Sequence, residues 1–350
     1  MRDARSGEQI RERRWKHVRR VAAWHDRFSV RHPRIASLMN SCVRGALTAY
    51  TRMELPRGVG LMEAAIAAMP GAWARSGERE CCGLWHGGRM RLDLADYYQR
   101  LASYLGRYHE VPLQLLIRCA LRSGDTFIDG GANNGLVSMA AAWRVGPSGK
   151  VWAFEPNPPV YERLRWHAEA NGLSQIAAMP IGLSDKREEL ELLVPGRDNL
   201  GAGTCAPLPE RYGGEVSQRG MVRLVRADEA GIDVRGELMA KLDVEGFELR
   251  ALRGMTSLIE RHQPLVVCEM NAEMLRRAGA SIEDVCGFML ARGYRGFGMD
   301  AGRAIARVRR LILTPLDLGR SPIPFDVAWI HPESQLWGRL APCIAGGARR

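Results

Sequence analysis

The chain has 350 residues, 46% of them apolar, so it can bury the core of one large domain or of a domain with an extension. Its net charge is +11, but residues 1–35 carry +7 of that charge, so the basicity belongs mainly to an N-terminal arm. The start of the chain has no signal-peptide core, the apolar stretch 59–74 is shorter than a membrane span, and the eight cysteines form no CxxC pair. These features predict a cytoplasmic protein with reduced thiols and no transmembrane segment.

Residues 1–80 are predicted to form a basic, mostly helical extension, with one helix over 8–30 and one or two more over 33–77. A solvated helix is the simplest interpretation of 8–30, and contact with an acidic partner, nucleic acid or anionic lipid is the alternative. Residues 81–333 are predicted to form the main domain, and 334–350 a C-terminal tail. The main domain begins with a hairpin over 85–92, which has a two-glycine turn, and helices over 93–105 and 110–121.

Strands alternate with helices from 126 to 299, which predicts a parallel sheet with helices on both faces. The first expected strand ends at 127–128. The other expected strands are 150–154, 176–183, 238–244, 264–268, 294–299 and 327–330. The expected helices are 136–145, 157–171, 247–259 and 281–292. The last two strands are expected to form an antiparallel edge hairpin. Two further strands, 190–194 and 221–226, flank a loop over 195–220 that is predicted to be a lid or a mobile segment.

The sequence TFIDGGANNG at 126–135 predicts a strand, a glycine turn and a helix in that order, which is typical of a nucleotide-binding loop. The glycine spacing does not fit the dinucleotide pattern GxGxxG, and no Gly-Lys-Ser/Thr follows, which excludes a P-loop. The turn contains Gly131, Asn133 and Gly135, and Asn tolerates left-handed backbone. Asp129 precedes the turn, where its charge suits a ligand with ammonium and sulfonium groups rather than a pyrophosphate.

Polar residues also end the next two expected strands. Glu155 follows the second strand, where a carboxylate can accept both ribose hydroxyls, and Ser184 with Asp185 follows the third, where it can meet an adenine edge. Each residue alone is equally explained as a helix cap or turn residue. The ordered set predicts a nucleoside site along the carboxyl ends of a parallel sheet.

Five motifs in this order, FIDGGANNG, FEPNP, GLSD, KLDVEGFE and PLVVCE, resemble the FkbM family of S-adenosylmethionine-dependent methyltransferases. The similarity covers about 85–300 and, with the closing strands, extends to 332. It implies the class I methyltransferase fold, a Rossmann-like seven-stranded sheet with an antiparallel last strand. It also implies that Asp129, Gly131, Asn133 and Gly135 line the methionine end of the cofactor, with Glu155 at the ribose and Asp185 near the adenine.

The acceptor side is expected around Lys241, Asp243 and Glu245, which share one face if their strand persists that far. This polar alternation at the end of a buried strand indicates either a catalytic site or a lysine–carboxylate network that fixes the strand end. A positioned base would take the proton from a hydroxyl acceptor.

Glu269 ends the following strand and is a further candidate catalytic residue. Asp243, Glu269 and Asn271 together are a weaker hypothesis for a Mg²⁺ site, because oxygen ligands are common and nothing fixes the geometry. His109 and Glu110 lie where the cofactor pocket of the family is closed. His109 and His331 are further candidate bases, although a lone histidine is more often structural.

The predicted function is transfer of a methyl group from S-adenosylmethionine to a hydroxyl of a small molecule or glycan. One alternative is an RNA or protein methyltransferase that holds its substrate with the basic arm, but the arm lacks the interleaved aromatic residues that stack on single-stranded nucleic acid. The other is a non-catalytic domain that binds the cofactor and recruits partners, against which the intact Asp129, Glu155, Asp185 and Asp243 argue.

Overall fold

The computed structural model describes 77–83, 87–196, 199, 201–208, 216–302, 309–318 and 322–346, together with isolated positions between 27 and 49. The chain divides into two compact units, residues 1–109 and 110–350. Apart from those isolated positions, the expected helices over 8–30 and 33–77 lie outside the described residues, as do parts of the loop over 195–220. In the part of the chain that is described, no helix is long and apolar enough to cross a membrane.

The described part of the first unit is a hairpin followed by a helix. Strands β1 (Glu78–Cys82) and β2 (Arg89–Asp93) pair antiparallel, so the first strand lies earlier than the one expected within 85–92. Helix α5 (Tyr97–Leu105) begins after Asp96, whose side chain accepts a hydrogen bond from the backbone N–H of Gln99. It ends at Gly106, which adopts the left-handed conformation that stops helices.

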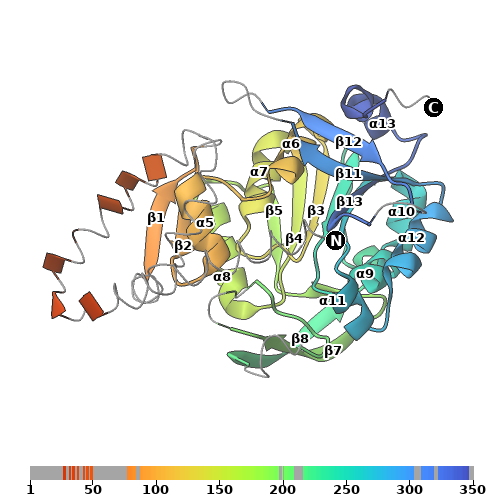
Figure 1. The fold of residues 1–350 in the computed structure, drawn as a ribbon. Helices are drawn as coiled ribbons and strands as arrows, with labels where there is room; N and C mark the ends of the chain where they lie inside the picture. Colours follow the sequence, from red (N-terminus) through yellow and green to blue (C-terminus); the bar gives the residue numbers. More distant parts are fainter. Residues whose placement is uncertain are drawn as a thin grey trace, which may run out of the picture. The chain divides into compact units, whose positions relative to one another are not determined.

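The second unit is built on an eight-stranded sheet with the order β12-β11-β13-β10-β9-β3-β4-β5 (Figure 1). The parallel strands are β3 (Thr126–Gly130), β4 (Lys150–Phe154), β5 (Ile176–Met179), β9 (Leu238–Leu242) and β10 (Leu265–Glu269). Their carboxyl ends therefore share one edge of the sheet, which we call the carboxyl edge. The chain runs outward from β3 to β4 on one side and returns to β9 on the other, so the strand order reverses between β3 and β9.

The last strand of the chain is reversed, as expected, but it does not lie at the edge of the sheet. Strand β13 (Asp326–Ile330) inserts between β10 and β11 (Arg295–Ala301) and is antiparallel to both. An additional strand, β12 (Leu311–Pro315), pairs with β11 and forms the outer edge. The strands expected at 294–299 and 327–330 do pair antiparallel, but their expected position at the edge of the sheet is wrong, because β12 lies outside β11. The mostly parallel α/β sheet with an antiparallel last strand is confirmed, with one strand more than expected.

Helices cover the sheet because its strands are apolar on both faces. Helices α9 (Glu248–Gly254), α10 (Thr256–His262) and α12 (Ile282–Leu290) bury their apolar residues in the same core as Ile128, Ala240 and Val266. Ser281 and Asp284 form the expected capping box of α12. The remaining helices of the unit are α6 (Val111–Ala120), α7 (Leu136–Val145), α8 (Pro158–Ala170), α11 (Ala272–Arg277) and α13 (Gln335–Leu340), with short 3-10 turns at Ala227–Glu229 and Ala341–Cys343 (Figure 1).

Two expected elements are interrupted. The strand expected over 176–183 stops at Met179, and β6 (Gly182–Leu183) belongs to a second, three-stranded sheet with β7 (Glu188–Val194) and β8 (Gln218–Val225). The helix expected over 247–259 breaks at Met255, between α9 and α10. Close packing explains a glycine beside that break, because a Cβ on Gly254 would lie 1.9 Å from the backbone oxygen of Ser184.

Candidate active site

The glycine turn after β3 lies directly against the end of β9. Gly131 has φ +73°, and a Cβ at this position would lie 1.8 Å from the backbone oxygen of Asp243. The backbone N–H of Asp243 donates to the oxygen of Gly130 at 3.0 Å. Only glycine fits this position, and the contact brings the expected cofactor turn and the expected catalytic carboxylate together at the point where the strand order reverses.

Asp129 and Lys241 form the buried centre of the site. They are partners in the β3–β9 register, and the Lys241 ammonium lies 3.7 Å from Asp129 and 3.1 Å from Asp243. Lys241 also donates to the backbone oxygen of Gly131 at 3.2 Å. Burial alone would lower the pKa of Lys241, but the carboxylates of Asp243, Asp129 and Glu110 outweigh it and raise that pKa. Lys241 is therefore a permanent cation that links the two strand ends, which is the network interpretation offered by the sequence.

The Asp129 carboxylate is fully buried. Its Oδ2 accepts a hydrogen bond of 2.6 Å from the hydroxyl of Ser138 on α7, whereas Oδ1 is buried without a hydrogen-bond partner. Burial raises the pKa of Asp129, although Lys241 and Ser138 oppose the rise. The Lys241 ammonium lies 3.7 Å from Oδ1, beyond hydrogen-bond distance, so Oδ1 keeps the capacity to accept a ligand N–H.

Glu155 fixes the shape of the glycine turn. One carboxylate oxygen accepts the backbone N–H of Asn133 and the other that of Asn157, each at 2.8 Å. Asn133 itself has φ +50°, the left-handed conformation expected of it. Burial raises the pKa of Glu155 to about 7, and the two backbone N–H groups oppose the rise. The carboxylate thus joins the β3 turn to the end of β4, and the remaining lone pairs are those that could accept ribose hydroxyls.

Gly135 begins α7 in the left-handed conformation, with φ +82°. A Cβ at this position would lie 2.4 Å from the side chain of Leu164 on α8. Gly135 therefore allows α7 to pack closely on α8, which explains why the last glycine of the motif is needed.

The expected strand over 238–244 ends two residues early, and this changes the position of Glu245. Strand β9 stops at Leu242, and Glu245 has φ +51°, so Lys241, Asp243 and Glu245 do not alternate along one strand as expected. Asp243 nevertheless meets Lys241, and 30% of its side chain is exposed. The carboxylate of Asp243 is therefore partly exposed at the carboxyl edge while it contacts Lys241.

Ser184 and Asp185 do not end a strand of the main sheet. They follow β6 in the second sheet, where Arg250 of α9 donates to one Asp185 oxygen with both Nε and Nη2, at 3.0 and 2.8 Å. Burial alone would raise the pKa of Asp185, but Arg250 outweighs it and the pKa is lowered. The expected row of three polar ends of the main sheet is corrected in this respect, because the third strand breaks after Met179.

Glu269 ends β10 as expected, and two further carboxylates that sequence reasoning missed lie beside it. Glu248, at the start of α9, is fully buried and accepts the backbone N–H groups of Val244 and Gly246. Asp326, at the start of β13, is the register partner of Glu269. Glu248 lies within the motif KLDVEGFE, so a capping role could have been read from it, whereas nothing near Asp326 in sequence predicts its neighbour.

Burial and the neighbouring carboxylates determine how these groups titrate. Burial, assisted by Asp243, Glu245, Glu248 and Asp326, raises the pKa of Glu269 to about 11. Burial likewise raises the pKa of Glu248 to about 7 and that of Asp326 to about 6. The raised pKa of Glu269 therefore favours its protonated form at neutral pH.

The described part of the loop over 195–220 packs against both the glycine turn and Glu245. A Cβ on Gly201 would lie 2.1 Å from the side-chain nitrogen of Asn133. The hydroxyl of Thr204 donates to the backbone oxygen of Glu245 at 2.8 Å and accepts the N–H of Ala206. This segment therefore touches residues expected to serve the cofactor and residues expected to serve the acceptor.

The candidate histidines occupy different places. His109 belongs to the first unit, where its ring lies 4.9 Å from that of Tyr98 and 4.5 Å from that of Tyr108. Glu110 belongs to the second unit and acts on the pKa of Lys241. His331 follows β13, whose reversed direction carries it to the edge opposite Glu269, next to Tyr294. The suggestion that His331 is a base is therefore wrong.

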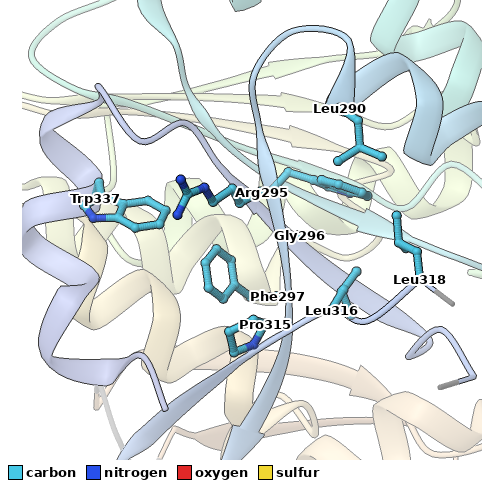
Figure 2. Close-up of a pocket in the computed structure, with 9 residues that line it drawn as sticks. Leu290, Arg295, Gly296, Phe297, Pro315, Leu316, Leu318 and Trp337 are labelled. Atoms are coloured by element: carbon cyan, nitrogen blue, oxygen red, sulfur yellow. The ribbon is translucent and has the colours of Figure 1, made fainter. Parts of the chain in front are cut away.

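A pocket of about 200 Å³ opens near that opposite edge (Figure 2). Arg295 and Trp337 lie beside one another in it, with the guanidinium carbon 5.3 Å from the centre of the indole ring. Since Arg295 pairs with Ile330, the last residue of β13, the pocket is separate from the carboxyl edge. It is lined by Leu290, Arg295, Gly296, Phe297, Pro315, Leu316, Leu318, Trp329 and Trp337.

Asn271, the amide ligand in the Mg²⁺ hypothesis, has a structural role in the protein. Asn271 caps α11, and its side-chain oxygen accepts the backbone N–H of Met274 at 3.3 Å. Among the described residues, no group of three or more His, Cys, Asp or Glu side chains is arranged to hold a metal ion.

The sheet topology and the residues at the carboxyl edge define the second unit as a class I methyltransferase domain. Residues 129–295, just under half of the chain, match the family described as Methyltransferase FkbM domain, in agreement with the resemblance seen in the sequence motifs. No curated protein matches the chain.

Three solved structures illustrate how distant the structural relatives are. Methyltransferase FkbM from Methylobacillus flagellatus KT is 17% identical with a TM-score of 0.36, and the match covers 79% of this chain and 59% of that one. A SAM-dependent O-methyltransferase from Thermotoga maritima is 12% identical with a TM-score of 0.34, over 64% and 65% of the two chains. A putative rRNA-methylase from Clostridium thermocellum is 12% identical with a TM-score of 0.35, over 62% and 92%. The chain thus spans less than two thirds of the first two relatives.

Proposed function

We propose that this methyltransferase uses S-adenosylmethionine and methylates a hydroxyl of a small molecule or glycan in the cytoplasm. The observation that carries the proposal is the backbone contact between Gly131 and Asp243, because it brings a turn suited to the cofactor within reach of a partly exposed carboxylate. The family match supports methyl transfer, and the geometry supports the assignment of roles.

The residues around the turn fit the methionine end of this cofactor. Asp129 offers a buried oxygen without a hydrogen-bond partner, and Gly131 lacks the side chain that would fill the approach. Glu155 holds Asn133 in place and is proposed to accept ribose hydroxyls with its remaining lone pairs. Glu110 is proposed to help close this pocket, because it acts on Lys241.

Asp185 is proposed to meet the adenine. Its Oδ1 accepts hydrogen bonds from Arg250 and Ser184. An adenine amino group would suit the second carboxylate oxygen, Oδ2.

When bound, S-adenosylmethionine would supply a methyl group that is attached to a positively charged sulfur. The acceptor oxygen would attack the carbon of that methyl group, in line with the carbon–sulfur bond. Asp243 is proposed to accept the proton of the acceptor hydroxyl as the carbon–oxygen bond forms and the carbon–sulfur bond electrons return to sulfur. Lys241 is a positioning residue in this scheme, because it orients Asp243 and the Gly131 carbonyl rather than facing the acceptor. In well-oriented systems, holding the reacting atoms in line lowers the activation barrier by about 7–11 kcal/mol.

Calorimetry with S-adenosylmethionine tests the cofactor assignment. Asp129→Asn and Glu155→Gln should weaken binding by at least ten-fold, whereas the exposed control Glu162→Gln on α8 should bind like the wild type. Unchanged binding in both site variants, or no binding by the wild type, contradicts the assignment.

Labelled-methyl transfer into a lysate tests the acceptor class. A small-molecule or glycan product should survive nuclease and protease treatment, and Asp243→Asn should abolish labelling while cofactor affinity is retained. Label that is lost with nuclease or protease supports the RNA or protein alternative instead, and normal labelling by Asp243→Asn rejects its role as the base.

A further inference from the structure

The carboxyl edge beyond Asp243 carries a row of acidic side chains. Cys268 is the register partner of Leu242, so Glu269 and Asp243, each one residue further along, are neighbours at the ends of β10 and β9. On its other side Glu269 is paired directly with Asp326 of β13. Two carboxyl groups paired directly on neighbouring strands would repel one another if both were ionised, so this arrangement needs an explanation.

No cation of the described residues neutralises the outer part of this row. Lys241 is committed to Asp129, Asp243 and the Gly131 carbonyl, and the ion pairs of the described residues include neither Glu269 nor Asp326. Glu269 is 7% exposed, and its Oε2 is buried without a hydrogen-bond partner. Glu248 beside it is 0% exposed and also has an unpartnered buried oxygen. Two buried acceptors aimed into one acidic cluster point to a ligand that supplies both charge and donors.

The charge of that ligand follows from the surroundings. Every titratable group that acts most strongly on Glu269 is a carboxylate, namely Asp243, Glu245, Glu248 and Asp326, and Lys241 acts on Asp326. An ammonium group of an organic molecule suits these side chains, because it supplies both a positive charge and N–H donors.

We infer that the methyl acceptor carries a protonated amine near its reacting hydroxyl, and that Glu269 and Asp326 recognise this ammonium. The inference rests on the proposed function, since it places the acceptor beside Asp243. In the empty site Glu269 is protonated. When the ammonium binds, Glu269 releases this proton to solvent and pairs with the ammonium as a carboxylate. The amine is a recognition group, and the methyl group goes to oxygen.

The inference is tested with full-length protein, labelled S-adenosylmethionine and a small-molecule extract of a lysate. Half of the extract is first treated with N-hydroxysulfosuccinimide acetate, which acylates amines and spares hydroxyls. The expected product binds a cation exchanger at pH 7, and the acylated half takes up at least ten-fold less label. A product that is not retained, or equal labelling of the two halves, overturns the inference.

Matched variants separate this inference from the proposed function. Glu269→Gln and Asp326→Asn preserve side-chain shape and should raise the KM for the labelled acceptor at least ten-fold while cofactor affinity stays within two-fold; the exposed Glu260→Gln on α10 should change neither. Unchanged KM in both site variants overturns the inference alone. Loss of cofactor binding by the wild type overturns the proposed function and the inference with it.

Discussion

The two halves of the carboxyl edge satisfy their carboxylates in different ways. In the β3–β4 half, Asp129 is paired with Lys241 and Ser138, and both oxygens of Glu155 accept backbone N–H groups. In the β10–β13 half, Glu269 and Asp326 face one another without a cation from the described residues. The first half is organised before any ligand arrives, while the second is left with charge that a ligand can satisfy.

The largest expected effect comes from removing Lys241, the cation that links Asp129 of β3 to Asp243 after β9, between the two halves. Lys241→Met leaves Asp129 and Asp243 without their counter-charge and should lower the free energy of unfolding by about 3–5 kcal/mol, as measured by urea denaturation. Adding Asp129→Asn should recover part of the loss, because it removes the most deeply buried of the two charges. A loss below 1 kcal/mol, or none recovered, would show that the network is not the link we describe.

Gly131→Ala should come next, because it drives the two halves apart. The left-handed backbone costs a β-carbon about 1–2 kcal/mol, and displacement of the Asp243 carbonyl adds to this and weakens cofactor binding. Gly172→Ala is the matched control, since Gly172 has φ +64° and no atom within 4 Å of the added Cβ. Equal changes in unfolding free energy and cofactor affinity for the two variants would contradict the role of the contact.

The pH dependence of stability distinguishes the halves through their titration ranges. The folded-state pKa values of Glu155, about 7, and Glu269, about 11, both lie above the ordinary value of 4.5, so the folded protein binds more protons than the unfolded chain. Their contribution is fully present below about pH 4.5 and is lost as pH rises, by at most about 1.4 kcal/mol per pH unit and group. The share of Glu155 ends near pH 7, whereas that of Glu269 continues above it.

Urea denaturation of Glu269→Gln between pH 5.5 and 8.5 measures this difference. Above pH 7.5 the free energy of unfolding should fall less steeply with pH in the variant than in the wild type, and exposed Glu260→Gln should match the wild type. Parallel slopes above pH 7.5 would mean that Glu269 is ionised in the folded protein.

The smallest effect is expected from the loop that touches both halves. Thr204→Val keeps the shape of the side chain but removes the hydrogen bond to the Glu245 carbonyl, which is worth about 1 kcal/mol. If this loop closes over the acceptor, the KM for the labelled acceptor should rise several-fold with little change in cofactor affinity. The half-buried Thr256, whose hydroxyl donates to the backbone oxygen of Arg253 near the end of α9, is a control as Thr256→Val.

The parts of the site that could be predicted are local in sequence. Asp129, Gly131 and Asn133 lie within five residues of one another, so the turn itself brings them close in space. Gly131 and Asn133 both have positive φ, a backbone conformation that glycine and asparagine adopt more easily than other residues. Glu155 was predictable because the next parallel strand places its end beside the turn. By contrast, Glu245 was misplaced because the residues cannot reveal that β9 stops at Leu242.

The sequence by itself thus determined the parallel α/β sheet, the FkbM resemblance and the glycine turn after β3, because strand periodicity and turn chemistry act over a few residues. Tertiary structure alone decided that β13 inserts between β10 and β11, which pairs Asp326 with Glu269 and carries His331 to the opposite edge. It also decided that Arg250 binds Asp185 and that Glu248 lies beside Glu269. These contacts depend on long-range strand pairing and helix packing, which no local pattern of residues encodes.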